Sequence, residues 1–146
     1  MNANESALQN CLFFTANRLS NVLRRLANDA YAETGVATSH LYLLIIVYQY
    51  PGISITELSE KLDVAPSTCT RFVDALVKQE ILSKEQEWKT VHVFLTDHGI
   101  DVTKKIDAAL SRFAEECIQT LGEEESLSLA AKMWNAANRL SAPSKK

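Results

Sequence analysis

The sequence predicts a mainly α-helical single domain, residues 1–146, that carries one small β-hairpin. The chain holds four glycines and three prolines among 146 residues, which is less than half of the roughly 12% that these turn-forming residues usually reach together. Apolar residues recur at steps of three and four near both chain ends, a spacing typical of amphipathic helices. Strict alternation of apolar residues is clearest in 91–95, which is typical of a strand. Together these observations argue against an all-β fold and against disorder.

The first third of the chain predicts two helices of different character. One extended helix is expected over about 5–33, and Gly35 follows it as a stop signal. A second helix is expected over about 39–49, with Thr38 or Ser39 as its N-cap. Because this second helix is apolar on all sides, we expect it to be buried on nearly every side.

The next stretch predicts two short helices joined by a tight turn. Ser54 and Glu57 have the spacing of a capping box, in which a hydroxyl and a carboxylate satisfy backbone N–H groups. A three-residue turn, 63–65, follows, and Pro66 suits the first position of a helix over about 66–79. One face of this helix is apolar. The opposite face carries Ser67, Thr68, Thr70, Arg71, Asp74, Ala75 and Lys78.

The remainder predicts a hairpin and two long helices. Strands are expected over 81–84 and 90–95, joined by a five-residue tip, 85–89. Thr96 is expected to cap a long helix, and Glu123 opens the last one, so that the order is α-α-α-α-β-β-α-α. The last helix is expected to pack through Leu127, Ala130, Met133, Trp134, Ala137 and Leu140.

Two short helices, a tight turn and a hairpin predict a winged helix-turn-helix over about 38–98. The major groove of DNA is about 12 Å wide and admits one helix with short polar and basic side chains. The hairpin, or wing, can then reach the neighbouring backbone or minor groove. The apolar stripes over about 5–36 and 100–141 have no partner within so small a winged domain, which indicates a helical dimer interface.

At this point the chain resembles the MarR family of bacterial transcription regulators, over about 8–140. The resemblance rests on 53–62, on 67–76, on the strand end 91–96 and on Gly99. It implies an obligate homodimer that binds a near-palindromic operator in double-stranded DNA, as a repressor in the usual case. It also implies release from DNA by a small ligand or an oxidant, and no cofactor.

The resemblance assigns candidate DNA contacts by position. Lys84 and Lys89 are the basic residues of the wing, and Lys78 lies on the polar face of the second short helix. Ser54 and Thr56 are candidates for phosphate contacts through hydroxyls and helix N–H groups, with simple capping as the alternative. The recognition-helix residues are Pro66, Ser67, Thr68, Thr70 and Arg71. For Arg71 the alternative is a surface ion pair with Asp74 at i+3.

The charge distribution and three departures from the family pattern favour a second hypothesis. Residues 53–98 hold five basic and eight acidic side chains and so carry the whole net charge of −3. Trp88 stands where the family's wing usually has an arginine, Glu80 stands where a glycine usually follows the recognition helix, and the wing loop is short. The alternative is therefore a degenerate winged-helix dimer that binds protein, with weak or no affinity for DNA.

The three cysteines allow a redox hypothesis. Cys11 resembles the reactive thiol of the family's peroxide-sensing branch, with Cys117 as a candidate resolving thiol. Its candidate neighbours are Tyr31, Tyr42, Tyr48 and Tyr50. The alternative is a buried, inert thiol, since no basic residue flanks Cys11. Cys69 lies on the apolar stripe of the recognition helix and is expected to pack in the core.

Other chemistries have no support in the sequence. We find no nucleophile–base pair, phosphate loop or metal-ligand cluster, so we expect neither an enzyme nor a metal site. His92 is expected to be exposed on its strand. A small-molecule effector site lined by aromatic residues and Arg18 is a further candidate, between the first, second and fifth helices. The longest apolar run, 41–48, has eight residues, whereas a membrane span needs about 20. We therefore expect a cytoplasmic protein that does not contact membranes.

Overall fold

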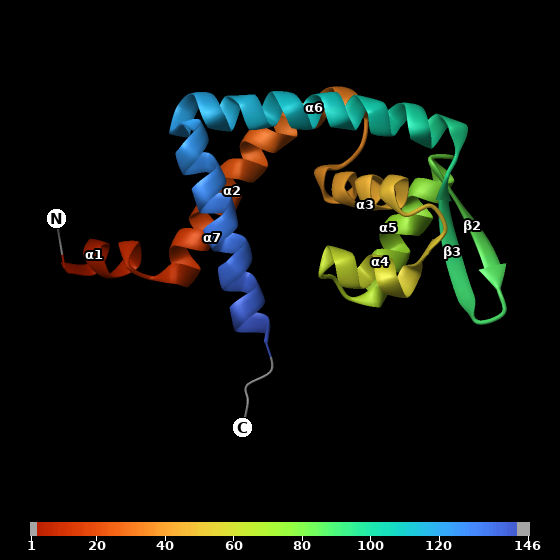
Figure 1. Cartoon of the computed structure of the whole chain (residues 1–146), viewed down its shortest axis with the longest axis horizontal. Helices are drawn as coiled ribbons and strands as arrows, with labels where there is room; N and C mark the ends of the chain where they lie inside the picture. Colours follow the sequence, from red (N-terminus) through yellow and green to blue (C-terminus); the bar gives the residue numbers. More distant parts are fainter. Residues whose placement is uncertain (1–2, 143–146) are drawn as a thin grey trace. The chain divides into compact units, whose positions relative to one another are not determined.

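The structure, a computed structural model, describes residues 3–142 and is mainly helical with one small sheet (Figure 1). Two compact units divide the chain, one ending at Leu110 and the other beginning at Ser111. The helices are α1 (Ala3–Gln9), α2 (Leu12–Tyr31), the 3₁₀ turn η1 (Ala32–Thr34), α3 (Thr38–Gln49), α4 (Ile55–Leu62), α5 (Pro66–Lys78), α6 (Asp97–Leu121) and α7 (Glu123–Ser141). The strands are β1 (Ile53–Ser54), β2 (Leu82–Glu87) and β3 (Thr90–Leu95).

The N-terminal helical stretch is interrupted between α1 and α2, so the prediction of one extended helix over 5–33 is wrong. The Asn10 side chain donates a hydrogen bond to the Ser6 carbonyl oxygen at 2.9 Å, and Cys11 adopts an extended backbone before α2 begins. Such a local bond from an asparagine competes with helix continuation. Gly35 (φ 71°) ends η1 in the left-handed conformation, and the predicted stop is confirmed.

Helix α3 supplies the centre of the core, but it is not buried on nearly every side as predicted. Tyr42 and Tyr48 are 53% and 54% exposed. The predicted cap is also wrong, because Thr38 is the first helical residue and its hydroxyl lies 2.6 Å from the Asn28 side-chain oxygen on α2. His40 packs edge-on against the Phe72 ring at 4.8 Å, which joins α3 to α5. The buried residues of α3 are Leu41, Leu43, Leu44 and Val47.

The sheet has three antiparallel strands in the order β1-β3-β2, and the sequence predicted only two of them. Strand β1 was missed because two residues are too short to show alternation. Its pairing of Ile53 with Val93 buries both side chains and fastens the hairpin to the start of α4.

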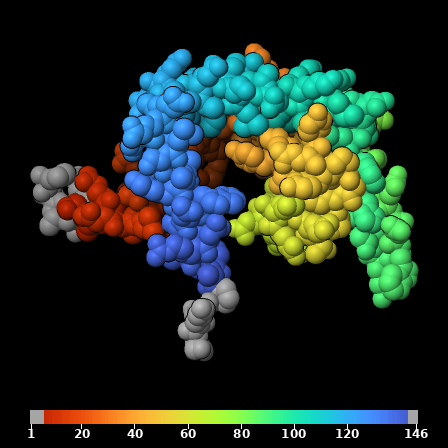
Figure 2. Space-filling view, in the orientation of Figure 1, coloured from red at the N-terminus to blue at the C-terminus, as the bar shows by residue number. Residues whose placement is uncertain are grey.

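The hairpin is tighter than predicted, and the five-residue tip 85–89 is wrong. Pairing continues as far as Glu87 opposite Thr90, which leaves a two-residue turn of Trp88 and Lys89. The charged side chains at the end of β2 remain in solvent, so they do not prevent their backbone groups from pairing with β3. Figure 2 shows the hairpin protruding beyond the helices α3 to α5.

The predicted cap at the start of α6 is confirmed. The Thr96 hydroxyl accepts a hydrogen bond from the Gly99 backbone N–H at 3.0 Å and donates one to the Glu80 carbonyl oxygen at 2.6 Å. Gly99 lies directly against the Ile81 carbonyl, where a Cβ atom has no room. These contacts place the start of α6 against the residues that follow α5.

Helix α7 begins at Glu123, as predicted, and its apolar stripe is largely exposed. Gly122 (φ 87°) precedes it, and no residue of α7 is buried. Trp134 is 71% exposed and Leu140 is 76% exposed. The stripe is therefore not covered within the second unit.

Among residues 3–142, no single helix has both the length and the apolar character that a membrane span requires. Only the bent pair formed by Leu12–Thr34 and Thr38–Gln49 meets both criteria, with a bend of 65°.

Candidate nucleic-acid interface

The start of α4 is held by the capping box that the sequence predicted. The Ser54 hydroxyl accepts a hydrogen bond from the Glu57 backbone N–H at 3.2 Å and donates one to the Glu57 carboxylate at 2.9 Å. The Ser54 backbone N–H donates to the same carboxylate. Ser54 is buried and its hydroxyl serves this cap, whereas Thr56 is exposed on the first turn of α4.

The turn between α4 and α5 is formed by three residues that the sequence located correctly. Asp63 ends α4 in the left-handed conformation, with φ 54° and ψ 47°. The Val64 backbone N–H donates to the Ser59 carbonyl oxygen at 3.1 Å, which closes the turn. Pro66 then occupies the first position of α5, after Ala65, whose side chain provides no cap. This turn fixes α5 against α4 without any glycine.

Helix α5 has the two faces that the sequence predicted. Cys69, Val73 and Leu76 are buried beneath it. Burial raises the pKa of the Cys69 thiol, which keeps it protonated and inert. On the outer side Pro66, Ser67, Arg71 and Lys78 are exposed, and Thr68 and Thr70 are half-buried.

The position of Asp74 decides the state of two candidate DNA contacts. Its carboxylate lies 2.6 Å from the Lys84 ammonium on β2, so Asp74 pairs with the wing rather than with Arg71. Arg71 consequently has no ion-pair partner among the described residues and extends from an open surface. The same ion pair ties the wing to the recognition helix.

The wing has two chemically distinct faces because side chains alternate along a strand. Lys84 and Gln86 lie on the face that carries Leu82 and turns toward α5. Glu85 and Glu87 lie on the opposite face. The acidic residues of the wing thus lie on the face opposite to Lys84, and Glu85 shares that face with its cross-strand neighbour His92.

His92 is half-buried rather than exposed, so the prediction for it is wrong. Its Nδ1 lies 2.8 Å from the Gly52 carbonyl oxygen, and its Nε2 lies 3.4 Å from a Glu87 carboxylate oxygen. A carbonyl only accepts, so the imidazole donates from Nδ1. Sequence reasoning missed this role because Gly52 and His92 are 40 residues apart.

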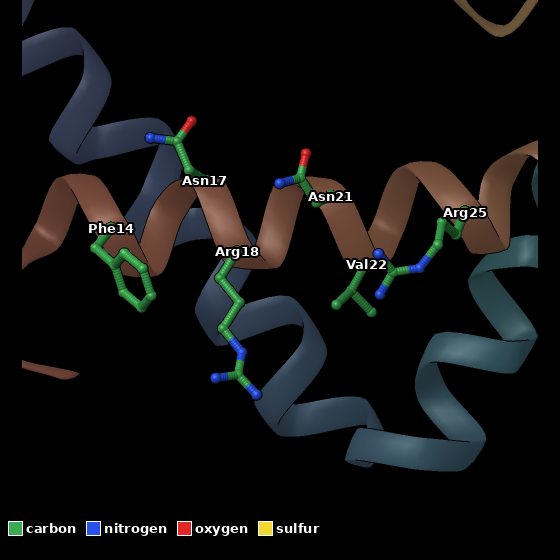
Figure 3. A pocket seen from close by; sticks show the side chains of 6 residues that line it. All are labelled: Phe14, Asn17, Arg18, Asn21, Val22 and Arg25. Carbon is green, nitrogen blue, oxygen red and sulfur yellow. The ribbon is translucent and has the colours of Figure 1, made fainter. Parts of the chain in front are cut away.

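A second candidate site is a shallow cavity along α2. Phe14 and Arg18 extend from the same side of the helix (Figure 3). The lining residues are Phe14, Asn17, Arg18, Asn21, Val22 and Arg25. They include two guanidinium groups and no carboxylate, a combination that favours an anionic ligand.

The candidate redox cysteines differ in exposure. Cys11 is exposed at the start of α2, so the alternative of a buried thiol is wrong for it. Cys117 is half-buried in the second unit. Among the tyrosines named as neighbours, Tyr31 is buried and Tyr42, Tyr48 and Tyr50 are exposed.

The segment 38–87, which contains α4, α5 and the outgoing strand of the wing, matches the sequence model of the MarR family. This winged helix-turn-helix is similar to that of the MarR family. The matched segment includes every candidate DNA contact except Lys89. It ends one residue before the tip of the wing.

The chain is also similar to individual helix-turn-helix transcriptional regulators. An uncharacterised helix-turn-helix transcriptional regulator of Bacillus cereus is 27% identical over 99 residues, which are 68% of this chain. The alignment spans 63% of that relative's own length, less than two thirds of it.

Solved structures of MarR-like fold align over most of the chain. The transcriptional repressor CouR, bound to a 23-mer DNA duplex, has a TM-score of 0.84 at 16% identity and covers 89% of this chain and 94% of its own. The PcaV regulator of Streptomyces coelicolor, in complex with its natural ligand, has a TM-score of 0.82 at 19% identity, covering 90% and 94%. These likenesses show a shared fold.

Proposed function

We propose that this chain is a transcriptional regulator of the repressor type that binds double-stranded DNA as a homodimer. The observation that carries the proposal is the outer face of α5, which is polar, open and centred on Arg71, a guanidinium without an ion-pair partner among the described residues. A guanidinium in that position suits the bidentate contact with guanine in the major groove.

The local charge is less adverse to DNA binding than the net charge of 53–98 suggests, because four of its eight carboxylates have a defined place. Of the acidic residues near the interface, Asp74 is neutralised by Lys84 and Glu57 belongs to the capping box. Glu85 and Glu87 lie on the far face of the wing. Half of the eight carboxylates of 53–98 are therefore engaged in the fold or lie on the side of the wing opposite to Lys84.

The homodimer in this proposal follows from the exposed apolar face of α7. A soluble chain rarely leaves large residues such as Trp134 and Leu140 in solvent without a partner. A second copy of the chain presents the same face, so a two-fold pairing covers both. Two recognition helices then reach successive major grooves about 34 Å apart on a near-palindromic site.

The test is binding to duplexes that the protein itself selects from a random-sequence library at about 50 mM salt, where phosphate contacts are strongest. Arg71→Ala is expected to weaken binding by roughly 5- to 100-fold, since a good bidentate contact contributes about 1–3 kcal/mol. Lys105→Ala removes the same charge from the exposed side of α6 and serves as the matched control, with a change below about threefold.

Two results would contradict the proposal. If the protein enriches no duplex at low salt, the winged helix serves another partner, and the alternative of a protein-binding module gains support. If both variants bind DNA as the wild type does, Arg71 has no place in the interface.

Regulation by a small ligand belongs to the same proposal. The cavity along α2 offers Arg18 and Arg25 to an anionic aromatic compound, with Phe14 as an apolar wall. A carboxylate ligand is expected to lower DNA affinity, and Arg18→Ala is expected to abolish that response while DNA binding without ligand stays intact. Isothermal titration with benzoate-type acids measures the binding directly.

Regulation by an oxidant is a separate part of the proposal and is tested independently of ligand binding. Peroxide would convert the Cys11 thiol to sulfenic acid and water, and the Cys117 thiol would then displace a second water to form a disulfide. Peroxide is expected to abolish DNA binding in the wild type and not in Cys11→Ser. Equal loss of binding in both proteins would exclude Cys11 as the sensor.

A further inference from the structure

The tip of the wing carries a feature that the proposed contacts do not explain. Trp88 is 87% exposed and has φ 55°, a left-handed backbone that bulky side chains rarely adopt. It occupies a two-residue turn, a position where glycine is preferred. The indole thus costs the turn on the order of 1 kcal/mol and buries almost nothing in return. A contact with another molecule would explain why an exposed tryptophan occupies this strained position.

The structure holds the Trp88 backbone in a defined place. The Gln86 side-chain amide donates a hydrogen bond to the Trp88 carbonyl oxygen at 2.9 Å, and the turn itself is closed by the pairing of Glu87 with Thr90. At the other end of the strand, the ion pair of Lys84 with Asp74 fixes β2 to α5. The indole is therefore carried on a hairpin whose base is tied to the recognition helix.

The length of the wing matches the distance between neighbouring grooves. Four residues separate Lys84 from Trp88, which at 3.3 Å per residue is roughly 13 Å along the strand. One turn of B-DNA is about 34 Å, so a minor groove lies roughly half a turn, about 17 Å, from the major groove next to it. An indole adds several ångströms of reach. When α5 lies in a major groove, Trp88 can reach the next minor groove.

The chemistry around the indole fits that groove better than a protein surface. The Lys89 ammonium lies 5.2 Å from the centre of the Trp88 ring, which places a phosphate-binding cation beside an apolar plane. Glu85 and Glu87 lie on the face of β2 opposite to Lys84 and Gln86. Apolar side chains that enter a minor groove unstack base steps and widen the groove.

We propose that Trp88 is an aromatic wedge that inserts into the minor groove beside the major groove occupied by α5. The inference rests on the proposed DNA-binding function and adds a specificity determinant to it. Because unstacking costs least at pyrimidine–purine steps, Trp88 selects such a flexible step at a fixed distance from the bases that α5 contacts.

The test compares the wild type with Trp88→Phe and Trp88→Gly on one duplex taken from the wild-type selection. Fluorescence anisotropy measures affinity, and 2-aminopurine placed at successive positions reports unstacking. Trp88→Gly is expected to bind about tenfold more weakly and to cause no rise in 2-aminopurine emission. Trp88→Phe is expected to keep both properties within about threefold, because it retains an aromatic plane.

A weaker binding of Trp88→Gly cannot be ascribed to unfolding, because glycine adopts φ 55° without strain. Thermal melting is the control, and Trp88→Gly is expected to melt no lower than the wild type. The wedge is overturned if Trp88→Gly binds the duplex as tightly as the wild type, while the proposed function stands. If the wild type selects no duplex at all, both proposals fail together. A flat 2-aminopurine signal at every position also overturns the wedge.

Discussion

At the start of α4, the hydrogen bonds between Ser54 and Glu57 both cap the helix and change the pKa of the Glu57 carboxyl. Hydrogen bonds from the Ser54 hydroxyl, and then from the Ser54 backbone N–H, lower the pKa of the Glu57 carboxyl below its ordinary value of 4.5. A carboxyl whose pKa is lower in the folded state stabilises the fold fully above its unfolded pKa. That stabilisation is lost as the pH falls through the lower, folded-state pKa.

Ser54→Ala is expected to lower the free energy of unfolding at neutral pH by about 1 kcal/mol, since it removes the N-cap hydroxyl. Denaturant unfolding measures this change, and Ser83→Ala, exposed on β2, is the matched control with a change below about 0.5 kcal/mol. A Ser54→Ala protein as stable as the wild type would contradict the role of the cap.

Glu57→Gln is expected to flatten the loss of stability as the pH falls below 4.5, the ordinary pKa of this carboxyl, because the titrating group is gone. Thermal melts over that range measure the effect. If the wild type and Glu57→Gln lose stability in parallel, another carboxyl controls the acid response.

Elements are joined by contacts at the junction of α5, β2 and α6. Thr96 bonds the carbonyl oxygen of Glu80, and Gly99 packs without a side chain on the carbonyl of Ile81. Glu80 itself has φ 56°, the conformation for which a glycine is usual after a helix. The junction orients the recognition helix relative to the wing.

Gly99→Ala is expected to destabilise the protein by roughly 1–3 kcal/mol, because the new methyl group collides with the rigid Ile81 carbonyl. The free energy of unfolding measures this, and Asp101→Ala on the exposed side of the same helix is the control. A stability equal to the wild type would show that α6 can shift at its start without cost.

At the scale of the whole molecule, the proposed dimer depends on the exposed stripe of α7. Leu127→Glu is expected to weaken self-association at least about tenfold, since a carboxylate in an apolar interface is costly. Lys132→Glu, on the opposite side of α7, is the control and leaves the dimer intact. Sedimentation equilibrium measures both, and a wild type that sediments as a monomer at micromolar concentration would contradict the dimer.

The sequence was most informative where structure depends on near neighbours. The capping box at Ser54, the turn after Asp63 and the first helical position at Pro66 are all confirmed. Each rests on residues within a few positions of one another, so a local pattern is sufficient to predict it. The same holds for the two faces of α5.

Sequence reasoning failed where a contact joins distant residues or where a local bond breaks a regular pattern. The interruption before Cys11, the missing strand β1 and the two-residue wing turn are examples. The candidate DNA contacts remain predictions, although the structure shows which of them are exposed and which are engaged within the fold.

The sequence by itself determined the helix-turn-helix, its family resemblance and the polar face that Arg71 centres. Tertiary structure alone decided that Asp74 pairs with Lys84 and that the carboxylates of the wing lie on the face opposite to Lys84. The physical reason is that helix caps and stripes are set by spacing along the chain, whereas strand register and ion pairs are set by which distant segments meet in space.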